Sequence, residues 1–224
     1  MENTTNIAKA VNPFDTDITS EQELSIDNMN MFQRAVKRTG DILFSLLGLI
    51  CLSPVFAIIA IKQKMTSEGP VFFKQERIGK NGKPFNIIKF RTMVVDAEDD
   101  GPELAKDGDS RLTKFGKFLR EHHLDELPQL WNVLIGDMSL VGYRPERQFY
   151  IDQIMARNPD YQLLYCSRPG ITSYATVYNG YTDTIEKMLT RLDMDLDYLK
   201  KRTLILDIKI IFQTVFQVGK GEKI

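Results

Sequence analysis

The sequence predicts a mostly helical α+β protein in which a membrane-inserted helical segment precedes one larger domain. Three observations predict this class. Residues 42–61 form an uncharged run long enough to enter a bilayer. Two short strand-like segments lie on either side of Asn81-Gly82, a strong hairpin-turn signal. The other apolar residues recur mostly with helical spacing. We therefore predict a polar tail (1–27), an amphipathic helix with a re-entrant membrane helix (28–65), and a cytoplasmic domain (66–224).

The composition excludes some functions. The net charge of −1 argues against bulk binding of nucleic acid, which favours a basic chain. Cys51 and Cys166 are far apart and have no metal-ligand spacing, so a reducing setting without a structural disulfide is expected. His122 and His123 are adjacent and cannot share a helix face, so we interpret them as flanking residues rather than metal ligands.

The N-terminal part is expected to consist of a polar tail followed by an amphipathic helix. Residues 1–27 are rich in Asn, Thr, Glu and Asp, which is typical of a disordered or loosely docked tail. Residues 29–39 alternate apolar and basic side chains in a pattern that suits an amphipathic helix on the membrane surface.

The uncharged run contains Ser53-Pro54 in its second half. Proline removes a helical hydrogen bond, and in lipid the freed carbonyl needs a partner such as the Ser53 hydroxyl. Basic residues flank both ends of the run, at 34–38 and at 62–64. Because positive charge marks the cytoplasmic side, we favour a re-entrant hairpin that keeps both ends there. A kinked single span is the alternative, and a buried core helix suits this all-apolar run less well.

The remaining elements follow in order. Residues 70–75 and 85–90 are predicted strands of one β-hairpin. Helical periodicity predicts four further helices, at 111–122, 127–135, 147–157 and 184–201. The last apolar segment, 204–218, is too short and too interrupted by polar residues to span a bilayer. It either lies in the membrane interface or closes the core.

Asp125 and Glu126 are the first candidates for chemistry. They stand before a short helix-like run with Pro128 near its first turn, so the helix dipole is expected to keep both carboxylates ionised. An acidic cap on a surface helix is the simpler interpretation of the pair alone. Basic residues crowd the same neighbourhood, and ionised carboxylates among cations suit a site for phosphate and a divalent metal.

Several ordered motifs give this pair a context. They are Lys89-Phe90-Arg91-Thr92-Met93, Arg111, Arg120, Leu124-Asp125-Glu126-Leu127-Pro128-Gln129-Leu130-Trp131-Asn132-Val133, Gly136-Asp137-Met138-Ser139-Leu140-Val141-Gly142, Arg144-Pro145-Glu146 and Arg168-Pro169-Gly170-Ile171-Thr172. Together they resemble the bacterial sugar transferase family, the monotopic phosphoglycosyl transferases, from about Lys37 to the C-terminus. The chain resembles the small, single-domain members.

The resemblance implies transfer of a sugar-1-phosphate from a UDP-sugar to a polyprenol phosphate, usually undecaprenyl phosphate, with release of UMP. In a two-step ping-pong route, Asp125 would attack the β-phosphate and form a phosphosugar ester, which the lipid phosphate then attacks. The resemblance assigns magnesium binding to Glu126. It also implies one leaflet of the bacterial inner membrane, a cytoplasmic catalytic face and downstream glycosyltransferases in exopolysaccharide, capsule, O-antigen or glycoprotein glycan assembly.

Physical chemistry supports these roles. Phosphoryl transfer needs cations on the phosphate oxygens, and Arg111, Arg120 and Arg144 offer bidentate contacts. Lys89 and Arg91 are further substrate-binding candidates, although each also suits the exposed face of a strand. Magnesium prefers one or two carboxylates with phosphate oxygens, so Asp125 is a second candidate ligand beside Glu126.

The chain departs from the family pattern at two places. Many family members have Pro-Arg-Pro where this chain has Tyr143-Arg144-Pro145. We carry Arg144 and Pro145 over as contacts to the nucleotide end of the substrate, whereas Tyr143 leaves the base contact open and could itself stack on uracil. Ser173-Tyr174-Ala175 replaces a glycine and a small apolar run that are common in the family.

Two other functions compete with this one. A metal-dependent glycosyltransferase would use an Asp-x-Asp pair, which the segment 193–197 offers. That segment lies in a helix-like stretch with Leu192, Leu196 and Leu199 at core spacing, so a solvated helix face is the better interpretation. The other is a noncatalytic membrane scaffold, which the intact carboxylate pair argues against. The sequence determines neither the sugar nor the oligomeric state, and it leaves a homodimer open.

Overall fold

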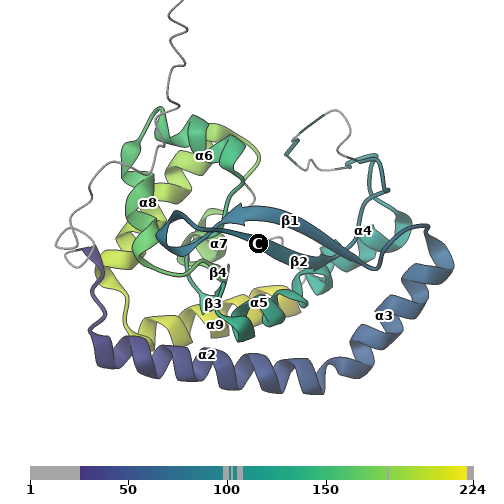
Figure 1. The fold of residues 1–224 in the computed structure, drawn as a ribbon, viewed down its shortest axis with the longest axis horizontal. Helices are drawn as coiled ribbons and strands as arrows, with labels where there is room; N and C mark the ends of the chain where they lie inside the picture. The colour runs from purple at the N-terminus through teal and green to yellow at the C-terminus, as the bar shows by residue number, and fades with distance from the viewer. Residues whose placement is uncertain (1–25, 98–100, 102, 105–107, 181, 221–224) are drawn as a thin grey trace, which may run out of the picture.

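The structure, a computed structural model, describes residues 26–97, 101, 103–104, 108–180 and 182–220 (Figure 1). Most of the predicted N-terminal tail therefore lies outside the described residues. The elements in chain order are α2 (Met31–Cys51), α3 (Ser53–Thr66), β1 (Phe72–Ile78), η1 (Lys80–Gly82), β2 (Pro84–Phe90), α4 (Lys114–Glu121), η2 (Leu124–Glu126), α5 (Gln129–Ile135), β3 (Ser139–Val141), α6 (Gln148–Met155), η3 (Pro159–Cys166), β4 (Gly170–Thr172), α7 (Tyr174–Asn179), α8 (Ile185–Lys201) and α9 (Leu204–Gly219). The mostly helical α+β class is confirmed.

Helix α2 is one continuous helix from Met31 to Cys51. Asn30 starts it with a capping box, since its side chain accepts from the Gln33 amide and its own amide donates to the Gln33 side chain. The predicted amphipathic segment 29–39 and the start of the apolar run at residue 42 lie in this one helix, because only Gly40 and Asp41 separate them and one glycine does not end a helix.

The helical path breaks at Leu52, and the axes of α2 and α3 differ by 56°. Ser53 and Pro54 open α3, where proline is tolerated, and the Ser53 Oγ donates to the Ile50 carbonyl at 2.8 Å. The predicted role of this hydroxyl is therefore confirmed. Within the described ranges, no single helix has the length and apolarity to cross a bilayer, but α2 and α3 together meet that requirement.

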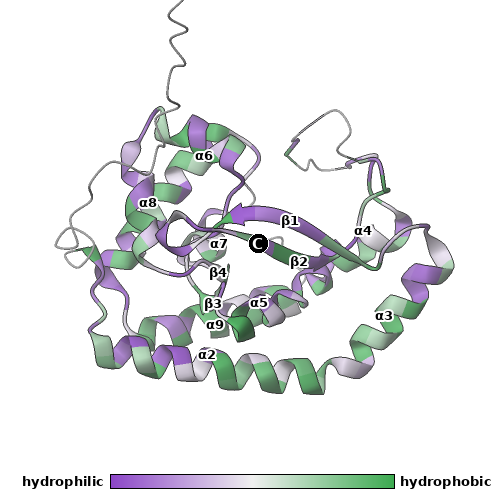
Figure 2. Cartoon of the chain, viewed as in Figure 1, coloured by the Kyte–Doolittle hydropathy of each residue, from purple (hydrophilic) through white to green (hydrophobic). Residues whose placement is uncertain are grey.

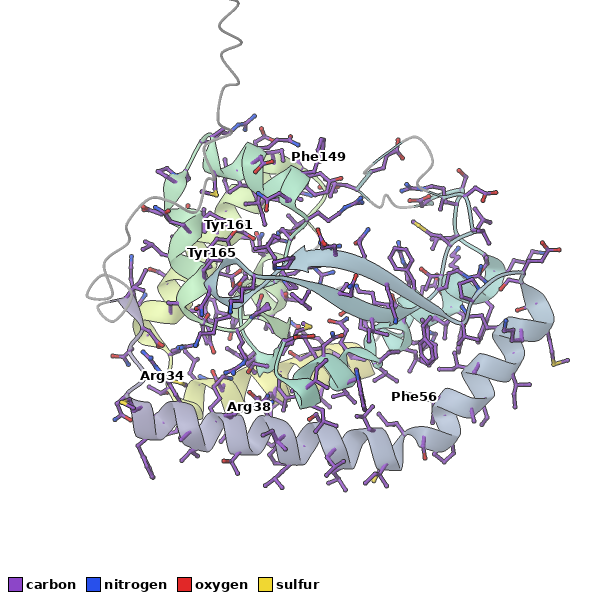
Figure 3. All side chains as sticks on the ribbon, viewed as in Figure 1. Arg34, Arg38, Phe56, Phe149, Tyr161 and Tyr165 are labelled. Carbon is purple, nitrogen blue, oxygen red and sulfur yellow. The ribbon has the colours of Figure 1, made fainter. Side chains whose placement is uncertain are left out.

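Helix α2 turns its polar side toward the protein. Asp41 and Ser45 are its buried residues, and the Asp41 carboxylate accepts from the Leu140 amide at 3.1 Å. Leu43, Phe44 and Leu47 are 60%, 64% and 56% exposed. Figure 2 shows the resulting apolar colour along the outer side of α2 and α3, while Figure 3 shows Arg34, Arg38 and Phe56 on the inner side.

The β-hairpin crosses the centre of the molecule, from the end of α3 toward α8 (Figure 1). Strands β1 and β2 are antiparallel, and the register pairs Phe73 with Lys89 and Arg77 with Phe85. Asn81 and Gly82 both have positive φ, 59° and 66°, as the predicted tight turn requires. Strand β1 extends through Arg77 to Ile78, beyond the predicted segment 70–75, because cross-strand pairing outweighs the weak strand propensity of charged residues.

The main core forms around α6, η3 and α8. Leu192, Leu196 and Leu199 are buried there, as their spacing predicted. The sequence analysis missed the two-stranded parallel sheet of β3 and β4, since each strand has only three residues. It also missed η3 and α7, which show too little periodicity to be recognised.

Helix α9 closes the core, which is one of the two alternatives that the sequence left open. Asp207 and Ile210 are buried and close the core. A second set of apolar side chains faces outward and is at least half exposed: Ile205, Ile208, Phe212, Val215 and Phe216. The helix therefore has two apolar faces with different surroundings.

Ion pairs fasten α2 to the C-terminal helices. Lys37 contacts Asp207 at 2.5 Å, and the same carboxylate accepts from the buried Tyr198 hydroxyl. Just before α2, buried Asp27 pairs with Arg202, between α8 and α9. These contacts hold α2 against α8 and α9.

Candidate active site

A cavity of about 570 Å³ lies over one face of the β-hairpin. Side chains from the hairpin, α4, η2, the segment after β3 and α8 line it, and most of the charged ones are cations. Its acidic residues include both members of the pair singled out in the sequence, Asp125 and Glu126. The cavity therefore contains the mixture of carboxylates and cations expected at a phosphate site.

The hairpin supplies one wall through alternate residues. Phe73, Gln75 and Arg77 of β1 and Ile87 and Lys89 of β2 all line the cavity, as the two-residue period of a strand requires. The Lys89 Nζ contacts the Glu126 Oε1 at 2.5 Å. Lys89 thus joins the hairpin wall to the carboxylate pair.

The carboxylate pair lies on the short 3-10 turn η2. His123, in the left-handed conformation with φ 53°, reverses the chain between α4 and this turn. Helix α4 itself packs closely on the end of the hairpin, since a Cβ on Gly116 would lie 1.9 Å from the Thr92 carbonyl oxygen. Neither carboxylate caps α5, because Pro128 is the N-cap and the first turn contains no acidic residue. The helix-cap interpretation of the pair was wrong.

The two carboxylates differ in electrostatics. Burial opposes ionisation of Glu126, but Lys89 and Arg144 outweigh it and hold the pKa of this carboxyl well below its usual range. Burial raises the pKa of Asp125, although Lys89 acts in the opposite direction. Desolvation of Asp125 therefore opposes the ionisation that the helix dipole was expected to favour.

Arg144 and the two residues after it form the opposite side of the site. The Arg144 Nη2 lies 3.4 Å from the Glu126 Oε1. Arg77 donates to the Pro145 carbonyl at 3.1 Å and pairs with Glu146 at 3.2 Å. Arg191 of α8 pairs with the same buried Glu146. This network fixes the segment that carries Arg144.

Asp195 of α8 also supports the segment that carries Arg144. It is 2% exposed, and its carboxylate accepts from the backbone amides of Arg144 and Ala175. Burial raises its pKa to about 7. Asp193 and Asp197 are exposed, so the Asp-x-Asp residues do not converge. The solvated-face interpretation was wrong for Asp195, which instead braces the site.

The other predicted residues fall into two groups. Arg91 and Arg120 line the cavity with Lys89 and Arg144. Arg111 and Pro145 are not among the lining residues; Arg111 pairs with Asp109 at 2.6 Å and with Glu103 at 3.3 Å. Tyr143 is completely buried in the core, so the stacking role considered for it is excluded.

Sequence reasoning missed Arg77 and Arg191 and assigned no role to Glu146. The alternation along β1 would have placed Arg77 on the face opposite Glu76, but the face that meets the cavity is known only from the pairing register. Arg191 comes from a distant helix, and periodicity alone predicts it to be an ordinary surface residue.

Among the described residues, no group of three or more His, Cys, Asp and Glu side chains is arranged to hold a metal. The cavity does contain two adjacent carboxylates, and both cation contacts of Glu126 fall on Oε1. Two carboxylates with room for phosphate oxygens fit magnesium, which rarely uses an all-protein ligand set.

Carboxylates held among cations in one cavity are the arrangement that enzymes acting on phosphate groups use. The chain belongs to the bacterial sugar transferase family, whose model matches residues 32–221.

Curated relatives agree with this assignment. The chain is 46% identical over 191 residues to the UDP-glucose:undecaprenyl-phosphate glucose-1-phosphate transferase of Klebsiella pneumoniae, covering 84% of this chain and 41% of that protein. It is 41% identical to the UDP-N-acetylgalactosamine-undecaprenyl-phosphate N-acetylgalactosaminephosphotransferase of Aeromonas hydrophila, covering 83% of this chain and 44% of that protein. It is also 43% identical to the UDP-glucose:undecaprenyl-phosphate glucose-1-phosphate transferase of Caulobacter vibrioides, covering 80% of this chain and 68% of that protein. The chain thus spans less than half the length of the first two relatives.

Proposed function

We propose that this protein transfers a sugar-1-phosphate from a UDP-sugar to a polyprenol phosphate such as undecaprenyl phosphate, with release of UMP. The observation that carries this proposal is the Asp125-Glu126 pair, which lies in one cavity with Lys89 and Arg144. The names of the relatives support both substrates. They include glucose and N-acetylgalactosamine transferases, so the sugar is left to experiment.

In the proposed first step, an Asp125 carboxylate oxygen attacks the β-phosphorus of the UDP-sugar. The bond from that phosphorus to the oxygen shared with the α-phosphate breaks, and UMP leaves with the electron pair. In the second step, an oxygen of the lipid phosphate attacks the phosphosugar ester and the Asp125 carboxylate leaves. The product is a polyprenyl diphosphate sugar.

The surrounding side chains suit these two steps. Lys89 and Arg144 contact Glu126 and stand ready to stabilise negative charge on the phosphate oxygens. Arg120 lines the same cavity and is a further phosphate contact. The carboxylate pair would hold Mg²⁺, which neutralises phosphate charge when it is bound. Binding of a cation would also favour ionised Asp125, whose pKa burial raises.

We further propose that α2 and α3 enter one leaflet and return to the cytoplasmic side of the bacterial inner membrane. The exposed apolar sides of α2, α3 and α9 support this, because water does not favour so large an apolar surface. The reaction would be the first membrane step of exopolysaccharide, capsule, O-antigen or glycoprotein glycan assembly, before downstream glycosyltransferases act.

A nucleotide-release assay tests the proposed activity. The full chain in detergent, with Mg²⁺ and polyprenol phosphate, is incubated with a panel of UDP-sugars. Release of UMP with formation of a lipid diphosphate sugar is expected for at least one sugar. Release of UDP instead would identify a glycosyltransferase, and a lack of any nucleotide release would favour the scaffold.

A further inference from the structure

The hairpin face that lines the cavity presents three cations at different positions along the strands, Arg77, Lys89 and Arg91. Arg77 is opposite Phe85 and Lys89 is opposite Phe73 in the register, while the Arg91 amide donates to the Val71 carbonyl. At about 3.4 Å per residue, Lys89 lies about 14 Å along the strands from Arg77 and about 7 Å from Arg91. Lys89 contacts Glu126, so the carboxylate pair lies between two cationic ends of one cavity.

The two ends have different surroundings. At the Arg77 end, the lining residues Arg144, Glu146, Arg147 and Arg191 are charged. At the Arg91 end, the lining includes Val94 and Val95, which are 50% and 61% exposed, and Phe73, 37% exposed, lies beside them at the level of Lys89. A purely polar substrate would make no favourable contact with these apolar side chains, whereas the hydrocarbon chain of a lipid phosphate would pack against them.

The Arg91 end adjoins the end of the apolar helical segment. The Arg91 Nη2 lies 3.3 Å from the Ser67 Oγ, directly after α3, and the guanidinium packs on Gly69. On α3, Ile58, Ile61 and Met65 are more than 60% exposed. A lipid lying along α3 would therefore bring its headgroup to Arg91.

Arg91 itself has unused binding capacity. It is only 7% exposed, and its Nη1 is buried without a hydrogen-bond partner in the described part of the chain. A buried guanidinium that lacks hydrogen-bond partners is costly, so an anion that reaches the Arg91 guanidinium from the cavity would be stabilised strongly. An isoprenoid phosphate monoester offers that anion together with a chain for those apolar side chains.

We propose that Arg91 binds the phosphate of the isoprenoid acceptor, whose first isoprene units lie against Phe73, Val94 and Val95. The nucleotide of the donor then occupies the Arg77 end. This inference rests on the proposed function and adds a division of the cavity into a donor end and an acceptor end. The plain alternative is that Arg91 only fixes the end of α3 through Ser67.

Steady-state kinetics of the full chain in detergent separate these two roles. Arg91→Gln is expected to raise the KM for polyprenol phosphate by about tenfold or more, because a charge-assisted contact is lost, while the KM for the UDP-sugar stays within about twofold. Arg91→Lys should recover part of the loss. Lys64→Gln is the matched control, since Lys64 contacts Gly69 from outside the cavity. Arg147→Gln, at the Arg77 end, should raise the KM for the UDP-sugar and leave the KM for polyprenol phosphate almost unchanged.

Equal rises in both KM values for Arg91→Gln, or an unchanged acceptor KM, would overturn the assignment. If Arg91→Gln does not fold, exposed Val95 provides a second test. Val95→Asp should raise the KM for a long-chain acceptor with no change for the donor, and Val95→Leu should change neither. An unchanged acceptor KM for Val95→Asp also contradicts the proposal. Failure of the wild-type protein to release UMP from any UDP-sugar would instead refute the proposed function.

Inhibition by inorganic phosphate and by a short-chain isoprenyl phosphate shows whether Arg91 binds a free phosphate or the phosphate of a lipid. The isoprenyl phosphate should compete with the lipid acceptor in the wild type and lose about tenfold in potency in Arg91→Gln. Inorganic phosphate should inhibit far more weakly. If both compete equally with the UDP-sugar, Arg91 belongs to the donor end and the proposal is wrong.

Discussion

The cavity and the outward side of α2, α3 and α9 are built from opposite kinds of side chain. In the cavity, the partly buried Glu126 and the buried Glu146 are held by cations. On the outward side, large apolar residues such as Phe44 and Phe212 are exposed. The cavity concentrates charge where phosphate chemistry needs it, whereas the outward side offers almost none. This difference agrees with the proposed transfer of a charged group to a membrane lipid.

Helices α8 and α2 show the same contrast element by element. Helix α8 buries Leu192 and Leu199 and exposes Asp197, as a helix in water does. Helix α2 buries Asp41 and Ser45 and exposes Leu43, Leu46 and Leu47. The same helical geometry is therefore used with inverted polarity, and the surroundings decide which face is stable.

The largest expected effect comes from the cavity. Asp125→Asn should lower UMP release by about 10³-fold or more, even without acceptor, because the amide is not a nucleophile. A single-turnover assay with radiolabelled UDP-sugar measures this. Asp197→Asn, on the exposed face of α8, is the control. Substantial UMP formation by Asp125→Asn would remove this residue from the nucleophile role.

The second effect concerns the buried charges that support the cavity. Glu146→Gln should lower stability by about 3–5 kcal/mol, since Arg77 and Arg191 would be left without their carboxylate. Thermal unfolding in detergent measures the change. Glu186→Gln removes the solvent-exposed pair with Arg157 and should lower stability far less than Glu146→Gln. Equal costs for the two variants would show that burial of this network contributes little.

The third effect tests the outward side. Phe44→Asp should weaken membrane contact by about 2–3 kcal/mol, because it places a carboxylate on the apolar face. Trp131, the single tryptophan of the chain, is half exposed on α5, which packs on α2, and reports the contact through quenching by brominated lipids. Phe44→Leu should keep the wild-type quenching. If Phe44→Asp keeps it too, this face does not meet lipid.

The fourth effect is a pH dependence of stability. The folded protein keeps Asp195 protonated to about pH 7, whereas the unfolded chain loses this proton near about pH 4, so raising the pH favours unfolding. Between about pH 5.5 and 8, this effect should lower the free energy of unfolding by about 2 kcal/mol. The loss should be complete once the pH is above the pKa of Asp195 in the folded protein. Melting temperatures of the wild type and Asp195→Asn across this range measure it. The variant should show the flatter profile, and parallel profiles would assign the pH dependence to other groups.

The smallest effect on stability is expected at the break between α2 and α3. Replacing Ser53 and Pro54 by alanine should cost about 1 kcal/mol or less, since one hydroxyl contact is lost and a good helix former is gained. It should nevertheless favour a straight helix. Cysteine labelling at both ends of the segment, with Cys51 and Cys166 replaced by serine, reports the topology. If both ends stay on one side, the Ser-Pro break does not set it.

Much of the fold was predictable because its signals are local. The hairpin turn at Asn81-Gly82, the break at Ser53-Pro54 and the apolar spacing of α8 each depend on a few neighbouring residues. The parallel pair β3 and β4 was not predictable, because its stability comes from a partner about thirty residues away. The same limit applies to Arg77 and Arg191, which meet at Glu146 only through the fold.

The sequence by itself determined the class of the protein, the carboxylate pair and the apolar segment, since residue type and order are sufficient for these. Only the tertiary structure decided that Asp125 and Glu126 lie in different electrostatic surroundings, that α2 buries its polar side, and that Asp195 braces the segment of Arg144. Burial and charge pairing arise between residues far apart in the chain, and they set the pKa of a group and the face that a helix exposes.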